Sequence, residues 1–340
     1  MLVAAIALLL SRSLPPQEFD TLPSAPPESF SWWQENLRWE LDTSLRFVAN
    51  GRGDTGFVGA FGLDVHKVIS TSHRDVATLV LQPYLLRTDS IAPPAPIFDG
   101  DHDFALQWRI FNANLNLSGD SRLNLRAGHF EFPFGLEQNI DTNGTLRQYT
   151  HGANFGFKTD WGTTLNGELM DLEYEFGWSR GSGNEYLDID GNGVWSGRIG
   201  TPRYGNSIYG LSFLSGDLLG RNGVERQHKL GLDAQFFWRS YSASFEVSGG
   251  EEGDSADVVR AVAELERHNP HESKSVWLQV FATHVDSPTL NDESVELRLG
   301  GLWRLNRGVS LGAQLVQFLD PLGSNNRRGL TGVFQLRYRL

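Results

Sequence analysis

One short segment of the chain has the residue types of a metal-binding loop. Asp188, Asp190 and Asn192 lie in the pattern D-x-D-G-N-G. Oxygen ligands at this spacing form the first half of a calcium loop, because Ca²⁺ prefers carboxylate and carbonyl oxygens. The twelfth position of such a loop normally supplies a bidentate Glu, whereas Ile199 stands there. We therefore expect either a calcium site or an acidic, glycine-rich hairpin loop, and no other cofactor.

Residues with catalytic potential form no recognisable motif. His268 and His271 flank Pro270 at a spacing of three, but without a helical context that would aim both rings at one metal. The patterns H-E-x-x-H, G-x-S-x-G and G-x-x-x-x-G-K-[ST] do not occur. The absence of Cys excludes disulfide scaffolds, thiolate zinc sites and iron–sulfur clusters. We therefore expect no enzymatic activity, the alternative being a Ser/His pair assembled only in three dimensions.

Most of the remaining charged residues alternate with apolar ones. The pattern is clear between Leu37 and Ala49 and recurs in residues 229–239, 241–248, 295–305 and 330–340. In a β-strand, alternate side chains point to opposite faces. Strands of this length exceed the usual ~5 to 6 residues and match tilted strands that cross an apolar band of ~25 Å. Because burying an unpaired charge is costly, the charged face must contact water.

The composition limits the class of protein. With 40% hydrophobic and 21% charged residues, the chain of 340 residues is too apolar for disorder and too polar for a bundle of membrane helices. Its 37 Gly and 21 Phe favour β-structure with many turns. The formal net charge of −12 makes nucleic acid an unexpected partner, since nucleic acids select basic surfaces.

The N-terminal segment is distinct from the rest. The apolar run from Leu2 to Leu10 is too short for a membrane helix of ~20 residues but suits the core of a secretory signal. No Lys or Arg precedes the run and no A-x-A site follows it, so a mistranslated or truncated start is the alternative. We expect a signal peptide at 1–13, a Pro-rich periplasmic linker at 14–31 and a folded unit at 32–340.

The alternation divides the folded unit into about sixteen expected strands. They are residues 36–49, 57–69, 76–87, 103–118, 122–131, 153–168, 171–180, 193–201, 206–216, 228–239, 241–250, 257–267, 274–285, 294–305, 309–319 and 329–340. Links after even-numbered strands are short, and links after odd-numbered strands are mostly longer, including 217–227 and 286–293. Short turns on one rim and long loops on the other are typical of outer-membrane barrels. The predicted fold class is all-β: one transmembrane antiparallel β-barrel.

Two motifs resemble known bacterial porins. The segment from Arg126 to Glu137 contains G-x-F-x-x-P-F-G-L-E and resembles the phosphate-selective porin O/P family and related porins, and residues 160–177 are similar to that family's next hairpin. The convincing match covers residues 122–183. The C-terminal Leu336, Tyr338 and Leu340 resemble the terminal-strand signal by which outer-membrane barrels are recognised for assembly, with Leu in place of the commoner final Phe.

The resemblance implies a 16-stranded porin, often trimeric, whose third external loop folds into the pore. The link after the fifth expected strand, 132–152, is the longest and begins at the matching motif, so it is the candidate constriction loop. The family's phosphate-specific members use clusters of Arg and Lys, and no dense cluster occurs here. Phosphate selectivity is therefore not expected.

The candidate site residues follow from this loop and from the alternation. The expected pore constriction consists of Arg126, Glu131, Glu137, Asp141, Arg147 and His151. The expected lumen wall includes Arg38, Arg46, Arg109, Arg298 and Arg337. Loop acids facing wall cations would create a transverse field that orients small solutes. The alternative is that the charges only solvate a wide lumen and pair with one another.

These expectations combine into one functional hypothesis. The chain is expected to be a porin for passive diffusion of small hydrophilic or ionic solutes across the outer membrane of a Gram-negative-type bacterium. Expected partners are the bilayer, lipopolysaccharide, the barrel-assembly machinery and two further copies in a homotrimer. The alternatives are a secreted β-sandwich that binds carbohydrate through its Trp residues, and a non-conducting structural or adhesive barrel.

Overall fold

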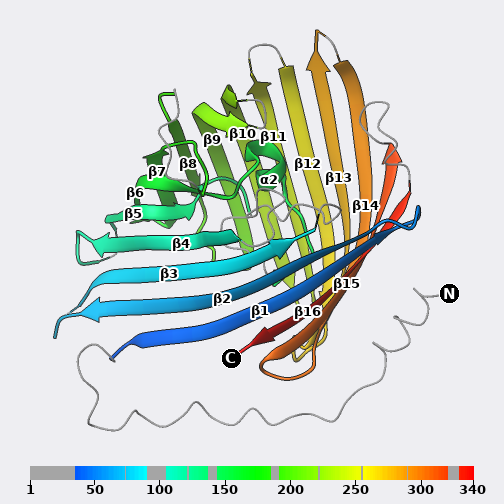
Figure 1. Ribbon diagram of the computed structural model, residues 1–340. Coiled ribbons are helices and arrows are strands. Elements are labelled where there is room, and N and C mark those ends of the chain that lie inside the picture. The colour runs from blue at the N-terminus through cyan, green and yellow to red at the C-terminus, as the bar shows by residue number, and fades with distance from the viewer. Residues whose placement is uncertain are drawn as a thin grey trace. The chain divides into compact units, whose positions relative to one another are not determined.

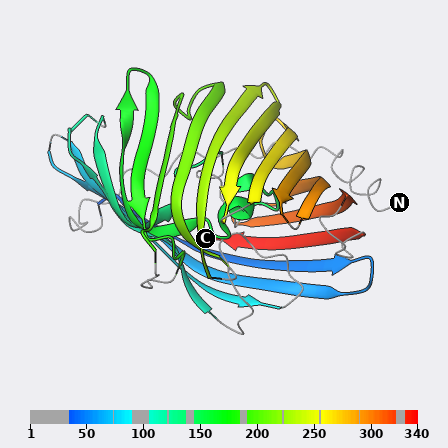
Figure 2. The ribbon, with the colours of Figure 1, turned by 90° about the horizontal axis from the view of Figure 1, so that it is seen from above.

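The protein forms a closed antiparallel β-barrel. The computed structural model describes residues 35–72, 74–89, 105–120, 122–136, 144–184, 191–220, 223–253, 256–288, 290–320 and 329–340. Within them, sixteen strands each pair with their neighbours in the sequence, and β1 pairs with β16 to close the ring (Figures 1 and 2). The closing register runs from Asp42 opposite Arg339 to Asn50 opposite Thr331. The expected fold class is therefore confirmed.

The strands agree with the expected ranges to within a few residues at most ends. They are β1 (Leu37–Asn50), β2 (Thr55–Ser70), β3 (Asp75–Thr88), β4 (Ala105–Asn116), β5 (Asn124–Glu131), β6 (Thr159–Leu169), β7 (Leu172–Ser179), β8 (Val194–Gly200), β9 (Ser207–Gly220), β10 (Gly223–Trp238), β11 (Tyr241–Glu252), β12 (Ala256–His268), β13 (Lys274–Ser287), β14 (Leu290–Arg304), β15 (Val309–Asp320) and β16 (Leu330–Arg339). The expected signal peptide and linker lie outside the described residues.

Residues 153–158 differ from the expectation. They were expected to begin the sixth strand, but a short helix, α2 (Thr150–Phe155), occupies this part of the chain. The helix ends at Gly156, which has the left-handed φ of 76° and donates its N–H to the carbonyl of Gly152. The spacing of Phe155 and Phe157 fits a strand, so the alternation alone gave the wrong assignment here.

Two long links were also wrongly expected. Residues 217–227 and 286–293 belong mostly to strands, because β9 and β10, and likewise β13 and β14, continue pairing almost to their connection. Asp217 lies opposite Arg226 in this extension, with Oδ1 and Nε 3.0 Å apart. Opposite charges on facing positions stabilise strand pairs, so polar residues here extend the sheet instead of ending it.

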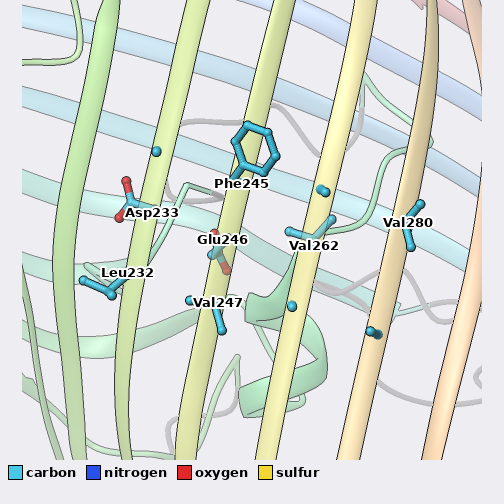
Figure 3. Close-up of a pocket in the computed structure, with 11 residues that line it drawn as sticks. Leu232, Asp233, Phe245, Glu246, Val247, Val262 and Val280 are labelled. Atoms are coloured by element: carbon cyan, nitrogen blue, oxygen red, sulfur yellow. The ribbon is translucent and has the colours of Figure 1, made fainter.

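The two faces of the barrel wall have opposite chemistry. Leu230 and Leu232 of β10 face outward and are 64% and 58% exposed. Asp233, the next residue after Leu232, faces inward and is buried. This arrangement is the reverse of a soluble protein. An outer hollow of about 390 Å³ crosses β10 to β13, and Figure 3 shows it with α2 behind the strands. Its outward-facing lining is apolar and consists of Leu232, Ala234, Phe245, Val247, Ala261, Ala263, Val280 and Ala282.

Aromatic residues mark one rim of the outer face. We call it the short-turn rim, because it carries the links 71–74, 117–123, 170–171, 201–206, 239–240, 269–273 and 305–308. Trp238 and Tyr241 stack there across the β10–β11 turn, with ring centroids 6.0 Å apart. Trp39 of β1 and Tyr338 of β16 lie near the same rim and are 57% and 46% exposed. Such rings are typical of a bilayer interface. Within the described ranges, no helix is long and apolar enough to span a membrane.

Candidate functional site

The inner loop is the segment of residues 132–158 that connects β5 to β6. The structure describes residues 132–136 and 144–158 of this segment, and these residues, which include α2, lie inside the barrel (Figures 1 and 2). Its contacts, given below, are with the inward-facing side chains of the wall. This placement is the one that the resemblance implied for the third external loop.

Aromatic side chains attach both ends of the inner loop to the wall. Phe134 packs so closely on β10 that a Cβ at Gly231 would lie 2.7 Å from Cζ of the Phe134 ring. Gly231 is therefore required for this approach. The aromatic side chains of the two loop ends and three wall residues form one buried cluster, consisting of Phe132, Phe134, Phe155, Phe157, Val194, Leu214 and Leu218. The motif that resembles porins thus supplies the apolar attachment of the loop.

The middle of the inner loop has two further apolar contacts. Leu146 packs with Val48, Trp277 and Val333, which belong to β1, β13 and β16. Leu136 and Tyr149 pack with Val262 of β12 and Phe281 of β13. The described loop therefore spans the inside of the barrel from β8 through β13 to β1.

Glu246 of β11 is a buried carboxylate that accepts hydrogen bonds from the inner loop. Its Oε2 accepts the backbone N–H of Leu136 at 2.7 Å, and its Oε1 accepts the hydroxyl of Thr150. Beside it, the N–H of Gly135 donates to Ser212 Oγ at 3.0 Å. Gly135 has a φ of +62°, a conformation that favours glycine, and a Cβ there would meet the Glu246 carboxylate. A buried carboxylate needs such donors because water does not reach it.

Arg147 connects the inner loop to two glutamates of β12. Its guanidinium lies 3.1 Å from Glu264 Oε1 and 2.9 Å from Glu266 Oε1. Trp277 adds a cation–π contact of 5.0 Å, and Gln279 donates to Glu264 at 3.2 Å. Burial and the charge of Glu264 raise the pKa of Tyr149 above its ordinary value, so this phenol stays protonated and faces the same carboxylate. The loop cation thus faces wall acids.

The other predicted site residues in the described part of the chain form separate contacts and not one cluster. Arg126 pairs with Glu175 at 2.8 Å, and Glu131 pairs with the buried Lys158 at 2.9 Å. Arg46 donates to the carbonyl of Thr145 in the inner loop at 3.3 Å. Glu137, Asp141 and the side chain of His151 lie outside the described residues.

The predicted lumen wall is a set of cations with acidic neighbours. Arg337 donates through Nε to Asp42 Oδ1 at 2.7 Å, and Arg298 pairs with Glu296. Arg109 is buried, whereas Arg38, at the start of β1, is exposed. Mutual pairing was the alternative reading of these charges, and several pairs of this kind are present.

Sequence reasoning missed which wall residues hold the loop. Glu246 and Glu264 were recognisable only as two inward-facing acids among many, and Ser212 and Gly231 gave no signal. Their role depends on which wall the inner loop reaches, and no local pattern encodes that choice.

The calcium prediction is not tested. Asp188 and Asp190 lie outside the described residues, and among the described residues no group of three His, Asp or Glu side chains could hold a metal. The backbone N–H of Asn192 donates to Asp217 at 2.9 Å, and its carbonyl accepts Trp178 Nε1 at 3.1 Å. These bonds hold Asn192 in the connection between β7 and β8.

Comparison with known proteins supports the fold. No protein-family model matches the chain, and no curated protein matches its sequence. Among solved structures, OprB of Pseudomonas putida has a TM-score of 0.67 at 11% identity, covering 90% of this chain and 94% of that one. An anion-selective porin from Comamonas acidovorans has 0.63 at 12%, covering 89% and 99%. The trimer form of OmpT, an outer-membrane protein of Vibrio cholerae, has 0.64 at 9%, also covering 89% and 99%.

At these identities the likeness concerns the fold alone. The chain has the 16-stranded barrel fold of outer-membrane porins. The narrower resemblance to the phosphate-selective porin O/P family is not confirmed by these comparisons.

Proposed function

We propose that this protein is an outer-membrane porin that lets small hydrophilic or ionic solutes diffuse passively through its lumen. The observation that carries the proposal is the division of the wall into an exposed apolar outer face and a charged inner face. The inner loop is attached to the charged inner face. An apolar outer face is favourable only in lipid, and a charged inner face gives solutes a polar path through the bilayer.

The inner loop narrows this path in our proposal. Its contacts attach it to β8–β13, β16 and β1, and Leu302 of β14 packs against the cluster that contains Leu146. Arg109 of β4 and Arg126 of β5 belong to the remaining part of the ring. Arg126 is paired with Glu175, and the two side chains keep some exposure, at 24% and 10%. Charges that are already paired within the wall bias the passage of ions but do not hold them, as a diffusion pore requires.

Assembly and partners belong to the same proposal. The OmpT structure from Vibrio cholerae is a trimer by its description, and we propose a homotrimer in contact with bilayer lipid and lipopolysaccharide. Leu336 and Tyr338, on the strand that closes the barrel, and Leu340, directly after it, are exposed and accessible to the barrel-assembly machinery. Deleting residues 338–340 should leave the protein unfolded in the periplasm, as fractionation would show. Normal insertion of the truncated chain would contradict this role.

Ion conduction in planar bilayers tests the pore. The purified, detergent-folded barrel should give stepwise currents in KCl, and the same sample should shift its mobility on gels when boiled. The closed barrel already excludes the β-sandwich alternative. A folded, heat-modifiable barrel that produces no current steps would favour the non-conducting structural or adhesive alternative and would overturn the proposed function.

A further inference from the structure

A second cavity lies inside the barrel between the inner loop and the short-turn rim. Its volume is about 240 Å³. Gly135 and Leu136 of the inner loop form one side, and side chains of β8–β10 and of the turn between β8 and β9 form the rest. The wall residues of the lining are Arg198, Arg203, Ile208, Gln235 and Phe237.

The charged residues in this lining are both cations. Arg198 is held by Asp233, with Nη2 2.6 Å from Oδ1 and Nε 3.0 Å from Oδ2. Arg203, in the turn, lies 3.6 Å from Glu173, which is a looser pair. Burial and the nearby charge of Arg198 lower the pKa of Arg203, while the charges of Glu173, Glu175 and Asp233 act in the opposite direction. The two guanidinium groups line the cavity and these carboxylates do not, so an anion inside the cavity would contact cations.

Most of the remaining lining is apolar. Phe237 lies on the same face of β10 as Asp233 and Gln235, which is the inward face, yet its side chain is 41% exposed. Ile208 and Leu136 beside it are buried. An exposed phenyl ring inside a polar lumen is unfavourable in water but offers a surface on which an apolar solute can pack.

We propose that this cavity is a binding subsite for small organic acids that join one carboxylate to an apolar ring. The carboxylate lies at the pocket side of Arg203 and Arg198, and the ring packs on Phe237 and Ile208. The cavity is smaller than the ~300 to 1,000 Å³ of sites for drug-sized ligands, so a single ring is the appropriate size. The inference deepens the proposed function, on which it rests, by naming a solute class that the pore would favour.

Benzoate is the probe for binding in this cavity, and two analogues serve as matched controls. Acetate keeps the carboxylate without the ring, and benzamide keeps the ring without the charge. In single-channel recordings, benzoate should interrupt the KCl current in a saturable manner, and both analogues should require about tenfold higher concentration. Calorimetry on the detergent-folded protein measures the same binding without conduction, with an expected Kd on the order of 1 mM, since a permeating solute must also leave.

Variants separate the two halves of the subsite. Arg203→Gln and Phe237→Ser should each weaken benzoate binding about tenfold, and Phe237→Leu should restore it to within about threefold of the wild type. Arg307→Gln is the matched control, because Arg307 is an exposed cation in another turn of the same rim. Its KCl current and its benzoate binding should both equal those of the wild type.

The outcomes distinguish the subsite from the pore. Two results overturn the subsite and leave the pore in place. One is normal KCl conductance without benzoate binding. The other is benzoate binding that acetate equals, or that neither Arg203→Gln nor Phe237→Ser weakens. Absence of KCl conductance overturns the proposed function, while calorimetric binding that is lost in Arg203→Gln and in Phe237→Ser still supports the subsite.

Discussion

The outer and inner faces of β10–β13 belong to the same strands but differ in polarity and in what covers them. On the outside, Leu232, Phe245 and Val247 line a hollow together with four alanines (Figure 3). On the inside, one residue further along each strand, Glu246 and Glu264 are buried beneath the inner loop. A buried side chain is therefore not always apolar in this protein, because the inner loop, and not lipid, covers the charged inner face.

The difference shows how a polar face can become rigid. Apolar outer side chains need no specific partner in lipid, whereas each buried carboxylate must find donors. Glu246 uses Leu136 and Thr150, and Glu264 uses Arg147 and Gln279. The inner face of β11 and β12 thus fixes the inner loop in one position, while the outer face imposes no comparable geometry.

The strongest test of the comparison moves a charge to the wrong face. Leu232→Arg places a cation on the outer face near the centre of β10, which should cost about 2 to 4 kcal/mol and prevent assembly. Gln235→Arg, on the inner face of the same strand, should assemble normally. Heat-modifiable mobility after expression measures both. Equal assembly of the two variants would contradict the assignment of the faces.

A smaller effect is expected where the inner loop meets the wall. Arg147→Met removes the partner of Glu264 and Glu266 but keeps an apolar side chain beside Trp277. Losing hydrogen bonds between charged groups should destabilise the attached loop by about 1.5 to 3 kcal/mol. Proteolysis of the folded barrel within residues 144–149 should become faster. An unchanged cleavage rate would show that this contact does not hold the loop.

The smallest effect is expected for an ion pair exposed at the rim. Arg122 pairs with Asp120, with Nε 3.0 Å from Oδ2, and the two side chains are 71% and 50% exposed. Arg122→Gln should therefore change the unfolding midpoint in denaturant very little. A loss as large as that of Arg147→Met would remove the distinction between covered and uncovered charges on which the comparison rests.

The sequence predicted the wall better than it predicted the loop. Alternation is local, so the facing of Leu232 and Asp233 could be inferred without knowing the fold. The contacts of Leu136 with Glu246 and of Arg147 with Glu264 join residues more than a hundred positions apart, and they exist only after the barrel closes. Period-two patterns also failed at Phe155 and Phe157, where the aromatic residues attach the inner loop and do not form a strand.

Deleting residues 139–147 tests whether the inner loop narrows a conducting pore. The deletion removes Leu146 and Arg147, with their contacts to the wall, and so exposes Glu264 and Glu266 to the path. Single-channel conductance in KCl should rise several-fold, and the reversal potential in asymmetric KCl should shift toward cation selectivity. An assembled deletion variant whose conductance and reversal potential equal those of the wild type would contradict the account.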